Sequence, residues 1–327
     1  MRKHIIAAFL CGLVIPLGIM GLGDLRAQRI ANRSTEAESD GLSPAPETTI
    51  SVVREDIQLV VLSDTGNLRQ MELEDYLVGV VLSEMPAGFE PEALKAQAVV
   101  ARTYVCKRMT GSKHSSAAVC VDPSCCQGYI SPEEYLDRGG SRASVDRVSH
   151  AVSQTRGYVL EYEGSLIDAT YFSCSGGTTE DAVAVWGQDV PYLQSVESPG
   201  EEDAPRYVSR ISFSAENFKL LTGCNGTGDP SGWFGVVRYT AGGGVDTIQI
   251  CGETYTGKEL RSILGLRSTA FTVTTEGDTI LFETRGYGHR VGMSQYGAQA
   301  MAERGSTWQE ILFHYYQGTE LAQLAEE

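Results

Sequence analysis

The order of apolar and polar residues predicts a hairpin and then two helices after residue 50. Residues 57–62 and 69–73 are β-type runs that flank the turn cluster Asp64-Thr65-Gly66-Asn67. Residues 74–82 repeat apolar side chains at the three- and four-residue spacing of one helical face. Pro86 should end this helix. A second helix is predicted for residues 91–109, because proline fits a first turn and the run is rich in alanine.

The rest of the chain continues this mixture of helical and β-type patterns. A helix is predicted at residues 143–154, and a second hairpin at 158–162 and 165–172. Residues 205–285 contain short β-type runs, many glycines and a third hairpin around residues 276–278. Helical patterns at residues 294–304 and 307–316 close the chain. We therefore expect an α+β fold of mixed helices and hairpins with a smaller, strand-rich subdomain.

The first fifty residues differ from the rest. Residues 5–23 carry no charged side chain and follow Arg2 and Lys3, and about 20 helical residues span a bilayer core. We expect one uncleaved transmembrane helix, a cytoplasmic N-terminus and an extracytoplasmic domain, as in a single-pass cell membrane protein. The alternative is a cleaved signal peptide, although residues 25–28 make a poor cleavage site. Residues 24–50 are predicted to be a flexible linker.

Composition narrows the possible functions. The chain has 327 residues, of which 42% are hydrophobic, so it can bury a substantial core. Its formal net charge of -16 and the lack of a basic stripe argue against nucleic acid as a partner, because such binding depends on Lys and Arg that neutralise phosphates.

Three ordered blocks carry a family resemblance. They comprise residues 73–104, which include Glu84-Met85-Pro86, residues 171–178 (YFSCSGGT) and residues 286–298 (GYGHRVGMSQYGA). Together they resemble the SpoIID/LytB family from about residue 50 onward. The resemblance implies a membrane-anchored lytic transglycosylase that cleaves peptidoglycan strands at the MurNAc-GlcNAc bond during engulfment in sporulation. It also implies that Glu84 is the catalytic acid.

The residues around Glu84 agree with that role. A carboxyl group among Leu82, Met85 and Phe89 should be desolvated, which favours its protonated form and suits a general acid. One acid can suffice when the 6-hydroxyl of the sugar attacks and a 1,6-anhydro product forms. A hydrolase would usually need a second carboxylate, and Glu180 and Asp181 are expected to be exposed on the surface.

The resemblance also suggests substrate-binding residues. A guanidinium can grip a sugar amide or carboxylate, tyrosine can stack on a sugar, and hydroxyls and backbone amides near glycines can contact a polymer. The candidates are Arg102, Tyr171, Ser173, Ser175, His289, Gln295 and Tyr296. Two positions depart from the family pattern: Arg290 stands where glycine is common, and Gln194 where lysine is common.

Cysteines suggest a metal loop. His114, Cys120 and Cys126 are spaced by six and six residues, and thiolate and imidazole are the usual zinc ligands. The resemblance implies a zinc ion on these three residues. We expect this zinc to be structural, because Glu84 already supplies the acid and attack by the 6-hydroxyl needs no metal-activated water. The fourth ligand is unknown, and Cys125 is a further possible ligand. The alternative is a disulfide among Cys120, Cys125 and Cys126, and Cys224 could also pair with Cys251.

The expected organisation follows from these features. Residues 1–23 are the anchor, 24–50 the linker, 51–204 the first part of the catalytic domain with the zinc loop, 205–285 the strand-rich subdomain and 286–327 the part that completes the catalytic domain. The resemblance implies as partners the amidase stage II sporulation protein P, which removes stem peptides first, and stage II sporulation protein M. Two alternatives are a non-catalytic glycan-binding module that enhances a partner amidase, and a zinc hydrolase, which lacks its usual motifs.

Overall fold

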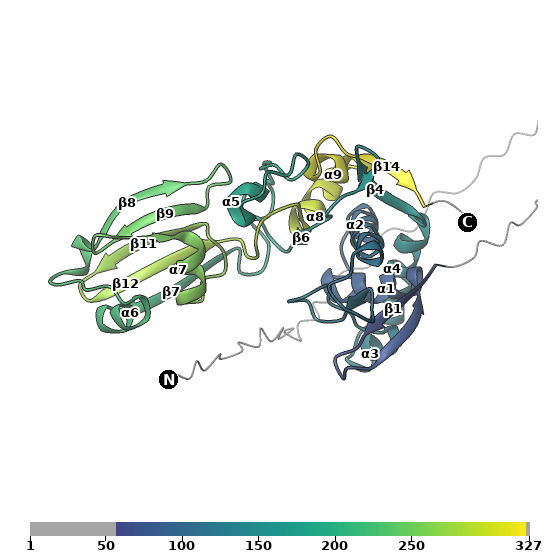
Figure 1. The fold of residues 1–327 in the computed structure, drawn as a ribbon, viewed down its shortest axis with the longest axis horizontal. Helices are drawn as coiled ribbons and strands as arrows, with labels where there is room; N and C mark the ends of the chain where they lie inside the picture. The colour runs from purple at the N-terminus through teal and green to yellow at the C-terminus, as the bar shows by residue number, and fades with distance from the viewer. Residues whose placement is uncertain (1–56, 325–327) are drawn as a thin grey trace, which may run out of the picture. The chain divides into compact units, whose positions relative to one another are not determined.

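Two hydrophobic cores organise residues 57–324, the part of the chain that the computed structural model describes (Figure 1). The larger core takes its buried residues from 59–196 and again from 291–316, whereas the smaller core lies within residues 213–282. The chain therefore leaves the larger core, builds the smaller one and returns.

Helix α2 (Pro91–Thr110) is the centre of the larger core. It contacts α1 (Leu73–Glu84), α4 (Arg142–Gln154), α8 (Gln295–Glu303) and α9 (Trp308–Tyr315), which Figure 1 labels. Most of its middle turns consist of buried alanine and valine. A helix that is apolar on every side must be covered on every side, and the small alanines let the neighbouring helices approach closely.

Small sheets surround these helices. β1 (Gln58–Leu62) pairs with β2 (Leu68–Glu72) in the predicted hairpin and, in parallel, with β3 (Val119–Cys120). The second predicted hairpin is shorter than expected. β4 (Tyr158–Tyr162) pairs with β5 (Ser165–Leu166) and β14 (Glu320–Gln323), but β6 (Tyr171–Phe172) pairs in parallel with β13 (Met293–Ser294). This last pairing joins two of the three family blocks.

Short helices and a strand-rich region account for the remaining elements. The two short helices are α3 (Pro132–Asp137) and α5 (Ala182–Trp186). The strand-rich region comprises β7 (Val208–Ser214), α6 (Ala215–Thr222), a 3-10 turn (Pro230–Gly232), β8 (Phe234–Tyr239), β9 (Val245–Ile250), β10 (Glu253–Thr256), α7 (Gly257–Leu264), β11 (Phe271–Glu276) and β12 (Thr279–Arg285).

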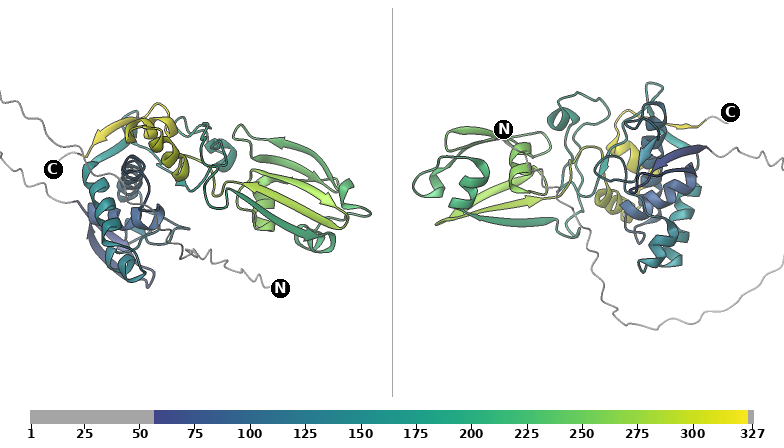
Figure 2. Two further views of the ribbon diagram at one scale, coloured as in Figure 1. Left: turned by 180° about the vertical axis from the view of Figure 1, so that it is seen from behind. Right: turned by 60° about the horizontal axis from the view of Figure 1, so that its bottom comes forward.

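Two antiparallel sheets enclose the smaller core. One has the strand order β11-β12-β7, and the other β10-β9-β8. In Figures 1 and 2 these are the green strands, with α6 and α7 beside them. Phenylalanine side chains of β7, α6, β8, β11 and β12 pack together in this core. The pairing of β11 with β12 forms the third predicted hairpin.

The mixed helix and strand architecture agrees with the expected α+β class. The predicted transmembrane helix and linker lie outside the described residues. Within residues 57–324, no helix is both long and apolar enough to cross a bilayer.

Candidate active site and metal centre

Glu84 is the last residue of α1, and three other segments converge on its carboxylate. The backbone N–H of Gly128 donates a hydrogen bond to Glu84 Oε1 at 2.6 Å. The side chains of Tyr171 and Gln295 also hydrogen-bond to this group. Burial raises the pKa of Glu84 above its ordinary value, although these three contacts act in the opposite direction. A carboxyl group in this setting retains its proton to a higher pH than one in water.

Two further glutamine side chains hydrogen-bond to the residues that contact Glu84. Gln127 Nε2 donates to the Tyr171 hydroxyl at 3.2 Å, and Gln295 Nε2 donates to Gln97 Oε1 at 3.5 Å. Gln127 Oε1 and Gln97 Nε2 are buried and have no partner within the described chain. Because buried polar atoms nearly always have partners, these two atoms are exceptions inside the protein, of the kind that a buried water molecule satisfies.

Of the other predicted residues, Ser173 and Tyr296 lie close to this centre. Ser173 is two residues beyond Tyr171, and its carbonyl accepts the N–H of Tyr296 at 3.0 Å. The Tyr287 hydroxyl is in hydrogen-bonding contact with the side chains of Ser173 and Tyr296. The ring of Tyr296 meets that of Phe89 edge-on, with 5.1 Å between centroids.

Arg102 lies inside the protein and has no surface to offer a substrate. Its side chain is 0% exposed and donates two hydrogen bonds, of 2.9 and 2.6 Å, to the Glu74 carboxylate. The remaining contacts go to the carbonyls of Val152 and Tyr158. Together these bonds hold α2 against α1, α4 and β4. The structure therefore corrects the predicted role, because Arg102 forms an ion pair inside the larger core.

Ser175 is also internal. Its hydroxyl donates to Glu201 Oε2 at 2.8 Å and accepts the N–H of Gly177 at 2.9 Å. The same carboxylate oxygen accepts from the backbone N–H groups of Ser175 and Gly176. Glu201 is thus a buried anchor that shapes the Ser-Gly-Gly turn, and the Ser175 hydroxyl is already engaged within it.

His289 packs against β6 as a neutral imidazole. Its ring lies beside Phe172 and Trp186, at 5.7 and 5.5 Å between centroids. Burial, and to a smaller degree the nearby Arg261, lower the pKa of His289 to about 4. Since side chains alternate along a strand, the Phe172 ring that His289 contacts faces away from the Tyr171 ring. The imidazole also hydrogen-bonds to the backbone of Tyr171, so it supports the strand that carries the Tyr171 side chain.

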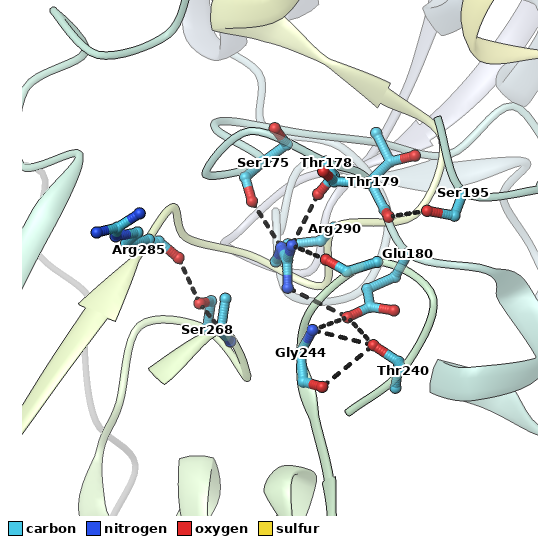
Figure 3. Close-up of polar contacts among 12 residues, drawn as sticks. Ser175, Thr178, Thr179, Glu180, Ser195, Thr240, Gly244, Ser268, Arg285 and Arg290 are labelled. Carbon is cyan, nitrogen blue, oxygen red and sulfur yellow. Dashed lines mark hydrogen bonds and ion pairs between the residues drawn. The ribbon is translucent and has the colours of Figure 1, made fainter. Parts of the chain in front are cut away.

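The first departure from the family pattern, Arg290, is built into the fold. It adopts a φ of +67°, a conformation that favours glycine. Its buried guanidinium bonds to Glu180 and to three carbonyls, those of Ser175, Thr178 and Gly242 (Figure 3). The expectation that Glu180 is exposed is wrong, because it is 1% exposed and pairs with this arginine.

The second departure, Gln194, has only a local effect. Its amide donates to the Val190 carbonyl at 2.9 Å and so closes the neighbouring turn. Asp181 is half-buried rather than exposed, and its carboxylate accepts the N–H of Ser195. Both side chains therefore hold the segment that follows the Ser-Gly-Gly turn.

The predicted metal loop brings four donors together. One donor atom each from His114, Cys120, Cys125 and Cys126 lies within 4.8 Å of all the others. His114 Nε2 is 3.4 Å from Cys126 Sγ and 3.8 Å from Cys125 Sγ, and the two sulfur atoms are 3.9 Å apart. The cysteines of residues 57–324 are free thiols, so neither alternative disulfide is present. Cys125 thus joins the three predicted ligands in one cluster that could hold a metal ion.

A turn at Asp122 shapes this loop. The Asp122 carbonyl accepts the N–H groups of both Cys125 and Cys126, and its side chain accepts the N–H of Ser124. The turn thereby brings the two neighbouring thiols to the same side of the loop.

The Cys126 thiol has a pKa below that of an ordinary cysteine. Burial raises its pKa, but hydrogen bonds from Cys120, His114 and Tyr104 outweigh this effect and bring the pKa of Cys126 to about 7. A thiol with this pKa readily provides the thiolate that metal binding requires.

The metal loop runs directly into the site of Glu84. Gln127 and Gly128, which contact Tyr171 and Glu84, are the two residues after Cys126. Sequence reasoning identified neither of them as part of the site. Only their position next to the metal loop could have drawn attention to them. Gln97 and Tyr287 lie inside the family blocks but were not singled out, and no motif marked Glu201.

Comparison with known proteins shows the family to which this chain belongs. The family model SpoIID, described as "Stage II sporulation protein", matches residues 63–162. Stage II sporulation protein D of Bacillus subtilis (strain 168) is 36% identical over 322 residues, with 96% of this chain and 94% of the relative aligned. The protein of the same name from Bacillus amyloliquefaciens is 38% identical, with 88% and 84% aligned. The amidase enhancer of Bacillus subtilis (strain 168) is 31% identical, with 75% of this chain and 40% of that protein aligned. These similarities, which extend over most of the chain, show that it belongs to the SpoIID family of sporulation proteins.

Proposed function

We propose that this chain is a lytic transglycosylase that cleaves the MurNAc-GlcNAc bond of peptidoglycan strands during engulfment in sporulation. The observation that carries the proposal is the environment of Glu84. Its carboxyl group has a pKa raised by burial, and it is oriented by the Gly128 N–H and by the side chains of Tyr171 and Gln295. Such a group is suited to donate a proton to a glycosidic oxygen.

The reaction needs only one such carboxyl group. Protonated Glu84 donates its proton to the glycosidic oxygen, and the bond from that oxygen to C1 of MurNAc breaks. The 6-hydroxyl oxygen of the same sugar then bonds to C1, and its proton returns to the Glu84 carboxylate. Tyr171, Gln295 and the Gly128 N–H stabilise the carboxylate between the two transfers.

The engagement of three other carboxylates supports this mechanism over a two-carboxylate hydrolase. Glu180 is buried against Arg290, and Glu201 accepts hydrogen bonds from four groups of residues 174–176. Asp181 accepts the N–H of Ser195. Each is therefore engaged in holding the fold.

We further propose that the metal is a structural zinc ion on His114, Cys120, Cys125 and Cys126. Zn–S bonds of about 2.3 Å and Zn–N bonds of about 2.0 Å in a tetrahedron separate neighbouring donors by roughly 3.5–3.8 Å. The observed separations of 3.4, 3.8 and 3.9 Å are close to this range. When bound, zinc would supply folding energy to the loop that presents Gly128 to Glu84.

Location and partners belong to the same proposal. The apolar run at residues 5–23 supports a membrane anchor, which would hold the domain outside the cytoplasm. The substrate would be strands whose stem peptides an amidase such as stage II sporulation protein P has removed. Stage II sporulation protein M would hold the two enzymes together.

A second candidate function has specific support. Similarity to an amidase enhancer over 75% of this chain favours a non-catalytic module that binds glycan and stimulates an amidase. The two functions differ in their need for the Glu84 proton.

The test is product analysis on purified peptide-free strands. Wild type should release fragments with 1,6-anhydro ends, and Glu84→Gln should bind strands without cleaving them. Glu134→Gln, a change at an exposed surface pair, should behave like wild type. Strand binding without cleavage by the wild type would favour the enhancer function. Reducing ends without the anhydro bridge would indicate a hydrolase.

A further inference from the structure

A row of half-exposed aromatic side chains leads away from the segment that follows Glu84. It consists of Phe89, Tyr296 and Tyr287, and we call it the aromatic row. Phe89 and Tyr296 meet edge-on at 5.1 Å between centroids, and the side chains of Tyr296 and Tyr287 are in hydrogen-bonding contact. The Ser173 side chain hydrogen-bonds to Tyr287 of this row. Ser173 also lies two residues after Tyr171, which contacts Glu84. The row is thus continuous with the proposed catalytic centre.

Arg267 lies at the Tyr287 end of the aromatic row. Its guanidinium carbon lies 5.7 Å from the centroid of the Tyr287 ring. No carboxylate of residues 57–324 forms an ion pair with it, although the chain is strongly acidic. The residue is partly exposed, and its guanidinium lies over the Tyr287 ring of the row.

The backbone holds Arg267 in a fixed place. Its carbonyl accepts the N–H of Gly288 at 3.2 Å, next to Tyr287. The adjacent Ser268 is fully buried and donates to the Arg285 carbonyl at 2.6 Å. Figure 3 marks this bond with a dashed line. Two successive residues are therefore tied to the segment that carries Tyr287, which reduces the ordering cost of binding a ligand there.

The chemistry of the proposed substrate offers a matching group. Each muramic acid carries a lactyl carboxyl group, which is a neutral amide while a stem peptide is attached. Removal of the peptide by an amidase leaves a free carboxylate on the strand. Arginine binds a carboxylate in a planar, two-point manner, and tyrosine offers both an apolar face and a hydroxyl to a sugar.

We propose that Arg267 binds the free lactyl carboxylate of a muramic acid residue whose strand lies along the aromatic row. This inference rests on the proposed function and deepens it. Arg267 becomes the residue that distinguishes strands without stem peptides from strands that carry them, while Glu84 performs the chemistry.

The test measures binding in a Glu84→Gln background, so that no strand is cleaved. Three ligands are compared: peptide-free strands, the same strands with their lactyl carboxylates converted to neutral methylamides, and chitin oligosaccharides, which have no lactyl group. We expect peptide-free strands to bind about tenfold more tightly than the amidated strands, as is typical of a charge-assisted hydrogen bond. Adding Arg267→Gln should reduce this ratio to about one and leave chitin binding unchanged.

Two controls isolate the effect. Arg238→Gln removes the same charge from an exposed arginine of β8 that also has no ion pair in the described chain, and it should keep the full ratio. Arg267→Lys should restore part of the ratio, because the charge returns without the planar fork. If Arg267→Gln weakens the binding of all three ligands equally, the arginine only packs on Tyr287 and the inference is wrong.

The outcomes separate this inference from the proposed function. If Arg267→Gln binds glycans and keeps the preference for free carboxylates, the inference is overturned while the transglycosylase proposal stands. If the Glu84→Gln protein binds neither peptide-free strands nor chitin, the proposed function fails and this inference fails with it.

Discussion

Arg290 Nη1 lies 3.1 Å from Glu180 Oε1, and the two side chains are only 2% and 1% exposed. Glu180 Oε1 also accepts hydrogen bonds from Thr240 and Gly244, while Arg290 reaches the Gly242 carbonyl (Figure 3). The pair therefore fastens the turn of residues 240–244 to the Ser-Gly-Gly segment. It also accounts for an arginine at a left-handed backbone position, since the hydrogen bonds offset strain of roughly 1–3 kcal/mol.

Arg290→Gly should lower the free energy of unfolding by about 3–5 kcal/mol, because the Glu180 carboxylate would remain buried without its partner. Relief of the backbone strain recovers only part of this loss. Denaturant unfolding measures the change. The matched control is Arg210→Ala, which breaks the exposed pair with Glu283 and should cost less than about 1 kcal/mol. Equal stability losses in the two variants would contradict a special role for the buried pair.

Tyr171→Phe should move the alkaline limb of the activity profile to higher pH. In the proposed mechanism activity requires protonated Glu84, so it falls as pH rises through the Glu84 pKa. The Tyr171 hydrogen bond lowers that pKa, and its removal should therefore raise the pKa further. The profile of kcat/KM against pH measures the shift, and the exposed Tyr239→Phe is the control. A shift to lower pH would show that Tyr171 does not stabilise the carboxylate.

Gly128→Ala should displace the Glu84 carboxylate. A Cβ atom at this glycine would lie 3.0 Å from Glu84 Oε1 and 2.8 Å from Ser83 Oγ. Because misplacement by about 1 Å can cost roughly 100-fold in rate, kcat should fall by about that factor, with little change in melting temperature. Gly232→Ala, where a Cβ atom meets nothing within 4 Å, should retain wild-type activity. Wild-type kcat in Gly128→Ala would contradict this prediction, because it would show that a methyl group at residue 128 does not disturb the Glu84 carboxylate.

Cys125→Ser should reduce zinc content and stability together, as should Cys126→Ser. Ligand binding energy becomes folding energy, and each kcal/mol corresponds to roughly 2–4 °C of melting temperature in a domain of this size. Metal analysis and thermal unfolding measure the two effects, with Cys251→Ser as a thiol control from the strand-rich region. If Cys125→Ser retains one zinc ion per chain at wild-type affinity, the fourth ligand is not Cys125.

Local sequence was sufficient for much of the secondary structure. The first hairpin, α1, α2, α4, α8 and α9 appear close to their predicted bounds, because the spacing of apolar residues and the positions of Pro86 and Pro91 act over a few residues. Helices α6 and α7 were missed inside a glycine-rich region, where short amphipathic segments resemble strand patterns. The sequence likewise indicated Glu84 in apolar surroundings and three residues of metal-ligand type in regular spacing.

Tertiary structure alone decided which of the remaining candidates meet Glu84. Arg102 pairs with Glu74, 28 residues away, Ser175 with Glu201, 26 residues away, and Glu180 with Arg290, 110 residues away. No periodic pattern encodes such pairs, because a polar side chain in the sequence does not show whether its partner is a ligand or a distant part of the same chain. The sequence by itself determined the local elements, the family resemblance and the apolar setting of Glu84. The long-range packing of the fold determined which side chains and backbone groups surround that carboxylate.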